Sequence, residues 1–294
     1  RLMKRNMTTI LLFVVLFVGL ALLLYPSVSD FYNSFHQSRA VATYNTVVEQ
    51  ESKKDYEADW AAANAYNEKL RAQSTVDRLI MTDEEREEYD AVMNVGGSGI
   101  IGVIEIPQIA VTLPLYHSTN ANVLQVAVGH IEGTSLPTGE PGTHSAFSAH
   151  RGLPSAKLFT NLDQLTYGDT FTLRVLDKVL TYEIDQILIV EPHDVSALQI
   201  YDGMDLCTLV TCTPYGVNTQ RLLVRGHRVP YNAAQAKHEA ADSAVSSFTV
   251  YGFVAPYGTL AIALAGIAVL RRNAAARTSH HAADWPHSLT VSVR

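Results

Sequence analysis

The chain is predicted to be mainly β, with helices before the β region and one transmembrane helix on either side. Three observations point to this class. Residues 96–232 contain short runs of β-branched and aromatic residues separated by proline and glycine. Residues 27–95 instead carry stretches of strong helix formers. Two further segments are uncharged and long enough to cross a bilayer.

Composition excludes several classes of protein. The 294 residues are 47% hydrophobic and only 17% charged, which fits a chain with apolar segments placed in a membrane. The net charge of −7 argues against a protein that holds nucleic acid by neutralising phosphates. The two cysteines are too few for a disulfide framework or a four-cysteine zinc site.

The first uncharged segment predicts a transmembrane helix over residues 9–26, with residues 1–8 in the cytoplasm. No charge lies between Arg5 and Asp30, and Ile10–Leu24 is apolar apart from Gly19. A cleaved signal peptide is the alternative. Tyr25-Pro26 follows the apolar run where small residues at a cleavage site would be expected, which favours an uncleaved anchor.

The second uncharged segment predicts a transmembrane helix over residues 250–270. A linker at 233–249 precedes it, and a cytoplasmic tail at 271–294 begins with Arg271 and Arg272. A buried helix of the β domain is the alternative. Basic residues flank the outer end of both spans, so both termini are expected inside and the β domain on the extracellular face of the membrane.

Residues 27–95 predict an acidic helical collar and a possible lid region. Residues 49–90 hold thirteen acidic and six basic residues, which accounts for the whole net charge. Thr82 with Glu85 fits a capping box that opens a helix through Val92. We expect a solvated collar between the membrane and the β domain. A calcium site at the carboxylates of residues 83–85 is the alternative, although the alternating ligand spacing of an EF-hand is missing.

Residues 96–232 predict many short strands, and therefore a sandwich or a barrel. Prolines, Pro114 among them, are expected at or beyond strand ends. Asp177-Lys178 is expected to connect a hairpin. The predicted strands are Ile100–Ile106, Gln125–His130, Ser145–Ala149, Thr170–Leu176, Val179–Val190, Cys207–Cys212 and Arg221–Val229.

A G-x-G-x-x-G sequence at residues 97–102 does not predict a nucleotide site. In the nucleotide-binding version, the glycines follow a strand and open a helix whose N-terminus meets the pyrophosphate. Here the expected order is reversed, because a helix precedes the glycines and a strand follows. We interpret the segment as a hinge into the first strand.

The chemistry of the β domain is predicted to centre on Cys212, at the end of a β-branched run. If this run pairs with the next one in antiparallel fashion, Cys212 faces Arg221 across the loop between them. A neighbouring cation favours the thiolate form of a cysteine, and the same guanidinium can bind an oxyanion. A buried, inert thiol is the alternative for Cys212. Cys207 is expected to be structural.

A thiol nucleophile needs a partner for proton transfer, and His150 is the candidate. It ends a predicted strand and precedes the exposed turn Arg151-Gly152. His130 and His144 are expected to be structural, and His227 is expected to face solvent or a cap.

Together, these residues resemble the sortase signature, and specifically the class C, pilus-assembling branch. The resemblance covers residues 25–270. The motifs that carry it are Thr208-Leu209-Val210-Thr211-Cys212, His150-Arg151-Gly152, Thr213-Pro214-Tyr215-Gly216-Val217-Asn218-Thr219 before Arg221, Gly133-Thr134-Ser135-Leu136-Pro137, and Leu158-Phe159-Thr160-Asn161-Leu162-Asp163.

The resemblance implies a closed eight-stranded barrel and a membrane-anchored cysteine transpeptidase that uses no cofactor or metal. Cys212 would attack the Thr–Gly bond of a Leu-Pro-x-Thr-Gly-type sorting signal and form an acyl-thioester. His150 would act as general acid and base, and Arg221 would hold the substrate and the oxyanion. The partners would be pilin or surface-protein precursors, and a pilin lysine amine would resolve the thioester.

Two departures from the class C pattern and three alternatives accompany this interpretation. Gln220 stands where relatives often carry histidine. No Asp-Pro-aromatic lid motif lies between Asp55 and Gly99, so a lid of another form or an open site is expected. The alternatives are a housekeeping sortase that attaches proteins to peptidoglycan, a thiol protease, and a membrane-anchored barrel without catalytic activity.

Overall fold

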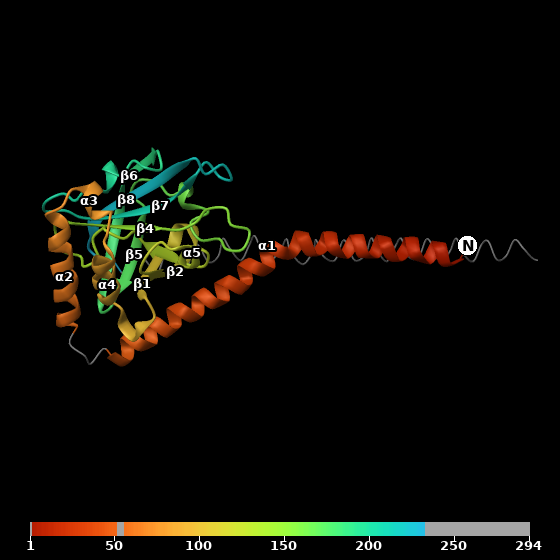
Figure 1. Cartoon of the computed structure of the whole chain (residues 1–294), viewed down its shortest axis with the longest axis horizontal. Coiled ribbons are helices and arrows are strands. Elements are labelled where there is room, and N and C mark those ends of the chain that lie inside the picture. Colours follow the sequence, from red (N-terminus) through yellow and green to blue (C-terminus); the bar gives the residue numbers. More distant parts are fainter. Residues whose placement is uncertain (1, 52–55, 233–294) are drawn as a thin grey trace, which may run out of the picture. The chain divides into compact units, whose positions relative to one another are not determined.

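Within residues 2–51 and 56–232, which the computed structural model describes, eight strands close into a barrel (Figure 1). The order around the barrel is β1-β2-β3-β4-β7-β8-β6-β5. The strands are β1 Ile100–Ile106, β2 Val111–Tyr116, β3 Val128–His130, β4 Thr143–Ser148, β5 Thr170–Val175, β6 Lys178–Val190, β7 Asp205–Thr213 and β8 Gln220–Val229. The predicted mainly-β class and the closed eight-stranded barrel are confirmed. The predicted linker, second span and tail at 233–294 lie outside the described residues.

Strand β7 lies between β4 and β8. It runs parallel to β4, with Thr143 opposite Asp205 and Ser148 opposite Val210. It runs antiparallel to β8, with Leu206 opposite His227. The C-terminal ends of β4 and β7 and the N-terminal end of β8 therefore meet at one end of the barrel.

Strand β2 is absent from the predicted set, because Pro114 was expected at a strand end. That expectation is wrong: Pro114 lies inside β2, opposite Val103 of β1. A proline cannot donate to a ladder, so it is tolerated where a strand has one neighbour. On its other side β2 pairs with β3 only at Leu115 and Tyr116, beyond the proline.

The barrel core is formed by the inward-facing residues of each strand. Phe147 of β4, Leu209 of β7 and Val224 of β8 are fully buried there, with Phe171 and Tyr182 stacked 5.5 Å apart between ring centroids. Burial of each such side chain stabilises the fold by about 1.5–3 kcal/mol relative to exposure. The core therefore holds β4, β7 and β8 in a rigid frame.

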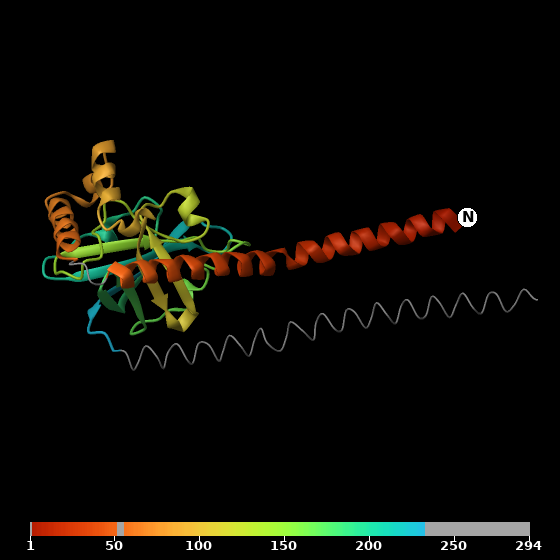
Figure 2. The ribbon, with the colours of Figure 1, turned by 90° about the horizontal axis from the view of Figure 1, so that it is seen from below.

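Helix α1 runs from Leu2 to Glu51 without interruption. Among the described residues it is the helix long and apolar enough to cross a membrane, with a mean hydropathy of 2.6 over its best window. The span predicted at 9–26 lies within it. Pro26 lies inside α1, and a proline bends a helix by removing a backbone hydrogen bond; Figures 1 and 2 show α1 as a long helix with a bend along its length.

Helices α2 (Glu57–Arg71), α3 (Thr75–Arg78) and α4 (Asp83–Ala91) follow. The predicted capping box is present: the Thr82 hydroxyl accepts from the Glu85 amide, and the Glu85 carboxylate accepts from the Thr82 amide. The collar was expected to be solvated. Its acidic side chains are largely exposed, but Tyr66, Leu70 and Tyr89 are buried in the same core as the barrel. One face of the collar is therefore part of the folded domain.

The segment between α4 and β1 agrees with its interpretation as a connection. A short 3-10 turn at Val95–Gly97 precedes β1, which begins at Ile100. The glycines therefore open a strand. This order differs from the strand–glycine–helix order of a dinucleotide site.

Candidate active site

Cys212 is the penultimate residue of β7 and is directly opposite Arg221 in the antiparallel pairing with β8. Residues directly opposite each other on neighbouring strands point to the same face of the sheet, with Cβ atoms about 4.5–5.5 Å apart. Both side chains are partly exposed. The structure thus places a thiol and a guanidinium side by side at an open end of the barrel.

His150 follows β4 by two residues, on the other side of β7. The last pair of the parallel register is Ser148 with Val210, so two further residues along each strand bring His150 level with Cys212. Two hydrogen bonds hold the chains together at this point. The Ala149 amide donates to the Val210 carbonyl at 3.2 Å, and the Thr211 hydroxyl donates to the Ala149 carbonyl at 2.8 Å. His150 and Arg221 therefore flank Cys212 on its two sides.

The outer face of β4, β7 and β8 carries an apolar cluster beside these three residues. Its members are Ala146, Val210, Leu223 and Leu198, which we call the outer cluster. Val210 precedes Cys212 by two residues and Leu223 follows Arg221 by two, so the alternation of a strand puts them on the same face as the thiol and the guanidinium. Leu198 comes from the connection between β6 and β7 and packs over the strands.

The two cysteines have different environments. Cys207 is fully buried in the barrel core, and burial raises the pKa of its thiol well above the usual value. It stays a neutral thiol, as expected for a structural residue. Cys212, five positions later, has the opposite strand parity and is partly exposed. A thiol in this position is accessible to a substrate.

The Arg221 guanidinium is oriented by backbone carbonyls at the start of β8. Its Nη1 donates to the Gln220 carbonyl at 3.0 Å and to the Asn218 carbonyl at 3.3 Å. A guanidinium has five N–H donors, so donors remain for a substrate oxygen. The Gln220 side chain donates to the Glu191 carboxylate at 3.0 Å. The residue that departs from the class C pattern thus has its own partner.

The loop after His150 packs against the loop between β7 and β8, a contact that the sequence does not predict. Arg151 forms an ion pair with Asp163, donates to the Thr213 hydroxyl and lies 5.7 Å from the centroid of the Tyr215 ring. Gly152 has a φ of +74°, and a Cβ there would lie 3.0 Å from the Tyr215 ring. The motif His150-Arg151-Gly152 was visible in the sequence, but the aromatic partner of Arg151 was not.

His130 and His144 are fully buried, as expected for structural residues. His130 is bonded to the Tyr89 hydroxyl at 2.9 Å and to the Ser135 carbonyl at 2.9 Å. Burial lowers its pKa to about 3. His227 on β8 is partly exposed, 3.6 Å from the Asp185 carboxylate.

The collar reaches the β6–β7 connection through Arg78. This side chain is 2% exposed, and it donates to the Gly133 carbonyl at 3.0 Å and to the Leu198 carbonyl at 2.5 Å. Burial lowers the pKa of Arg78. Leu198 is also a member of the outer cluster, so Arg78 ties the collar to one wall of the candidate site. The sequence by itself predicts no lid residue in this segment.

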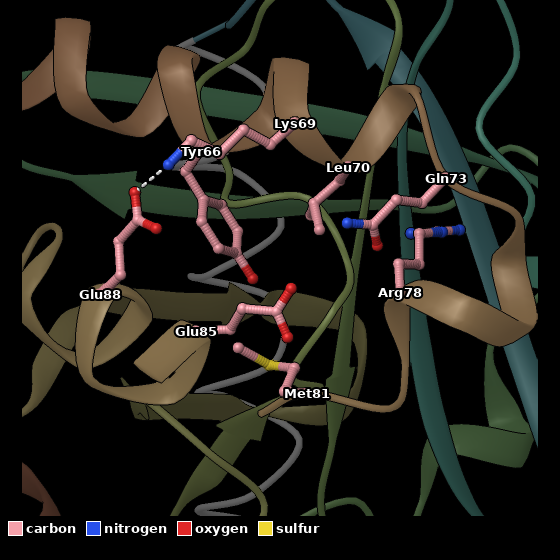
Figure 3. Close-up of a pocket in the computed structure, with 8 residues that line it drawn as sticks. All are labelled: Tyr66, Lys69, Leu70, Gln73, Arg78, Met81, Glu85 and Glu88. Atoms are coloured by element: carbon pink, nitrogen blue, oxygen red, sulfur yellow. Dashed lines mark hydrogen bonds and ion pairs between the residues drawn. The ribbon is translucent and has the colours of Figure 1, made fainter. Parts of the chain in front are cut away.

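A pocket beside Arg78 is separate from the candidate site (Figure 3). Its lining comes from residues 66–88, and it includes the ion pair of Lys69 with Glu88. Cys212, His150 and Arg221 are not among its lining residues.

Comparison with known proteins agrees with this geometry. Residues 104–229 match the family model described as the sortase domain. The crystal structure of sortase C1 from Streptococcus agalactiae is 46% identical, with a TM-score of 0.62, and the match covers 66% of this chain and 100% of that one. Sortase C of Streptococcus pneumoniae is 42% identical, with a TM-score of 0.58 and coverage of 66% and 98%.

A curated relative, sortase D of Bacillus subtilis (strain 168), is 30% identical over 131 residues. That match covers 44% of this chain and 63% of the length of the relative. The barrel, its strand order and the similarity to these proteins lead to one assignment. The chain belongs to the sortase family, whose members are cysteine transpeptidases.

Proposed function

We propose that this chain is a membrane-anchored transpeptidase that cleaves a Leu-Pro-x-Thr-Gly-type sorting signal and joins the acyl fragment to a lysine amine of a pilin subunit. The observation that carries the proposal is the register of β4, β7 and β8, which puts His150 and Arg221 on either side of Cys212. The similarity to sortase C of Streptococcus pneumoniae, a protein whose structure is described as informative on pilin substrate specificity, supports the pilin assignment.

The first half-reaction forms an acyl-enzyme. The Cys212 thiolate attacks the threonine carbonyl carbon, and the carbonyl oxygen takes the negative charge of a tetrahedral intermediate. Arg221 donates hydrogen bonds to that oxygen. When the intermediate collapses, the C–N bond breaks, and protonated His150 gives its proton to the departing glycine amine. A thioester on Cys212 and a neutral imidazole remain.

The second half-reaction transfers the acyl group. A lysine amine attacks the thioester carbon, neutral His150 accepts a proton from that amine, and the Cys212 thiolate leaves. The products are an isopeptide bond and the starting enzyme. Covalent capture thus splits one difficult amide exchange into two easier steps.

The outer cluster supports an extended apolar peptide as the substrate. Val210 and Leu223 lie two residues from Cys212 and Arg221 on the same face, and Leu198 closes one side. The cluster itself is buried, so an apolar peptide would contact the partly exposed side chains packed against it, of which Val190 is opposite Arg221 on β8. Arg78, which holds the Leu198 backbone, is then expected to influence substrate binding.

The test is intact mass spectrometry of the full chain in detergent with a Leu-Pro-x-Thr-Gly peptide. We expect an acyl adduct on the wild-type chain and none on Cys212→Ala. Cys207→Ala is the matched control and should keep the adduct. Absence of an adduct on a folded chain whose Cys212 is alkylated by a small reagent would overturn the substrate assignment, and an inert Cys212 would favour a barrel without activity.

The acceptor is tested by adding three nucleophiles to the acyl-enzyme. A pilin domain with an exposed lysine should consume the adduct faster than a peptidoglycan cross-bridge peptide or water. Preference for the cross-bridge peptide would indicate a housekeeping role, and preference for water would indicate a protease.

The membrane assignment is also part of the proposal. The apolar first half of α1 supports an anchor, and the basic residues before it support placement of the barrel on the extracellular face. Extraction of the full chain from membranes by detergent, but not by high salt or carbonate, is the expected result.

A further inference from the structure

Helix α1 does more than lead the chain to the barrel, because several of its side chains bind barrel backbone. Near its C-terminal end, the Tyr44 hydroxyl donates to the Ile101 carbonyl and accepts from the Leu176 amide. Three more side chains do so closer to the apolar segment. The Asp30 carboxylate accepts from the Lys157 amide at 2.8 Å, and the Asn33 amide donates to the Ser155 carbonyl at 2.7 Å. One turn further, the Gln37 amide donates to the Val126 carbonyl at 2.8 Å. These bonds fix the barrel at a defined level along α1.

That level is close to the end of the apolar segment. Asp30 is six residues after Leu24, so with a rise of 1.5 Å per residue it stands at most about 9 Å beyond the apolar run. The bend of a helix at a proline only shortens this height. The headgroup region on each side of a bilayer is about 5–8 Å thick. Ser155 and Lys157 are therefore expected at the level where headgroups meet water.

The part of the barrel held at this level is the catalytic end. Ser155 and Lys157 belong to the same loop as His150, which packs against the β7–β8 loop through Tyr215. Tyr215 and Val217 of that loop are 60% and 64% exposed. Figures 1 and 2 show α1 leaving the barrel at the end where the β7–β8 loop lies.

The side chains of α1 near this level suit a lipid interface. Tyr25, Phe31, Tyr32 and Phe35 are all more than half exposed. Aromatic residues at the ends of transmembrane helices typically lie among lipid headgroups. Together with Tyr215 and Val217, they form what we call the interfacial set.

We infer that the catalytic end of the barrel rests on the surface of the bilayer, with Tyr215 and Val217 in the headgroup layer. The partner of this surface is the lipid bilayer itself. The inference rests on the membrane anchoring given under the proposed function. It adds that Cys212 meets its peptide substrate where that peptide leaves the membrane.

The test measures contact with lipid by fluorescence quenching. The full chain carrying Cys212→Ala is reconstituted in phosphatidylcholine–phosphatidylglycerol vesicles, and one cysteine at a time is introduced for a small fluorophore. Val217→Cys probes the proposed surface, and Phe17→Cys probes the anchor. Asp202→Cys probes the connection just before β7, at the opposite end of a strand whose eight steps span about 26 Å. The lipids carry nitroxide quenchers on the headgroup or deep in the acyl chain.

We expect loss of fluorescence at Val217 with the headgroup quencher, loss at Phe17 with the acyl-chain quencher, and no loss at Asp202 with either. A Val217 label that is quenched no more than the Asp202 label, in vesicles where Phe17 is quenched, would overturn the inference while leaving the anchor intact. Failure to quench at Phe17 would overturn the anchoring and the inference together.

A second comparison tests the tether. Asp30→Ala with Asn33→Ala removes both bonds to the His150 loop, so quenching at Val217 should weaken while quenching at Phe17 is unchanged. Asp30→Asn keeps an acceptor for the Lys157 amide and should preserve the quenching. Gln37→Ala removes a bond of the same kind away from this loop and is the matched control. Equal quenching in the double variant and in wild type would contradict the role of the tether.

Discussion

The two ends of the β4–β7 pair hold the same kinds of side chain in opposite environments. At the starting end, His144 and Cys207 are fully buried. His144 is bonded to the Gln199 carbonyl and the Thr208 hydroxyl, both at 2.7 Å. At the finishing end, His150 and Cys212 are partly exposed. A histidine and a cysteine thus occur twice on neighbouring strands, and both residues at the starting end are structural.

The difference shows that environment, more than residue type, decides which pair can react. Burial lowers the pKa of His144 to about 4 and raises that of Cys207, so both groups stay neutral near pH 7. A neutral thiol is a poor nucleophile. At the other end, His150 and Cys212 are in contact with solvent, and Arg221 is directly opposite Cys212.

Replacing each cysteine by alanine should separate the effect on the reaction rate from the effect on the free energy of unfolding. Cys212→Ala should lower kcat/KM for transpeptidation by about 10⁴-fold or more, because the nucleophile is lost. Cys207→Ala should retain most activity and lose about 1–2 kcal/mol of unfolding free energy, because a buried group is removed. Peptide-cleavage kinetics and thermal unfolding in detergent measure the two effects. A Cys207→Ala variant that is fully folded but inactive would contradict the structural role of Cys207.

Acid should destabilise the fold through the buried histidines. The pKa of His130 is about 3 and that of His144 about 4 in the folded chain, against about 6.5 when unfolded. The unfolded state binds more protons between these values, so stability is complete above pH 6.5 and is lost as pH falls. Each histidine should cost about 2 kcal/mol between pH 7 and pH 5. Thermal unfolding at several pH values measures the slope, and a folded His144→Gln variant should show a shallower one.

Two glycines with positive φ should respond differently to a methyl group. Gly152→Ala should lose about 1–2 kcal/mol of stability through backbone strain. It should also lower kcat, because the new Cβ displaces Tyr215 from the His150 loop. Gly168→Ala has a φ of +89° and open space around its Cβ, so it should show the strain without the loss of kcat. Equal kcat values for the two variants would contradict a role for the Tyr215 contact.

Removal of the Arg78 tie should have the smallest effect on activity. Arg78→Met leaves the Leu198 carbonyl without its guanidinium donor and frees the β6–β7 connection. We expect KM for the sorting peptide to rise about fivefold at nearly constant kcat, which corresponds to the roughly 1 kcal/mol of one hydrogen bond. Arg86→Met breaks an exposed ion pair with Glu132 and is the control. A changed kcat with constant KM would contradict a role in substrate binding.

Local patterns in the sequence determined much of the fold and of the candidate site. Strand β1 was predicted with its observed bounds, and the capping box at Thr82 and Glu85 was predicted correctly, because both depend on neighbours within a few residues. The opposition of Cys212 and Arg221 also followed from the sequence, since a hairpin brings its two strand ends together. Strand β2 was missed because Pro114 lies inside it. A proline is tolerated there because β3 pairs with β2 only beyond the proline, which local sequence does not reveal.

Only the tertiary structure decided which distant groups meet. The parallel register of β4 with β7 brings His150 level with Cys212, although sixty-two residues separate them in the chain. The burial of Arg78 against Leu198, the packing of Tyr215 on Gly152 and the bonds from α1 to the His150 loop are contacts of the same kind. Sequence periodicity reports the faces of single elements. Which faces lie against each other depends on how the whole barrel closes, and that closure builds the site.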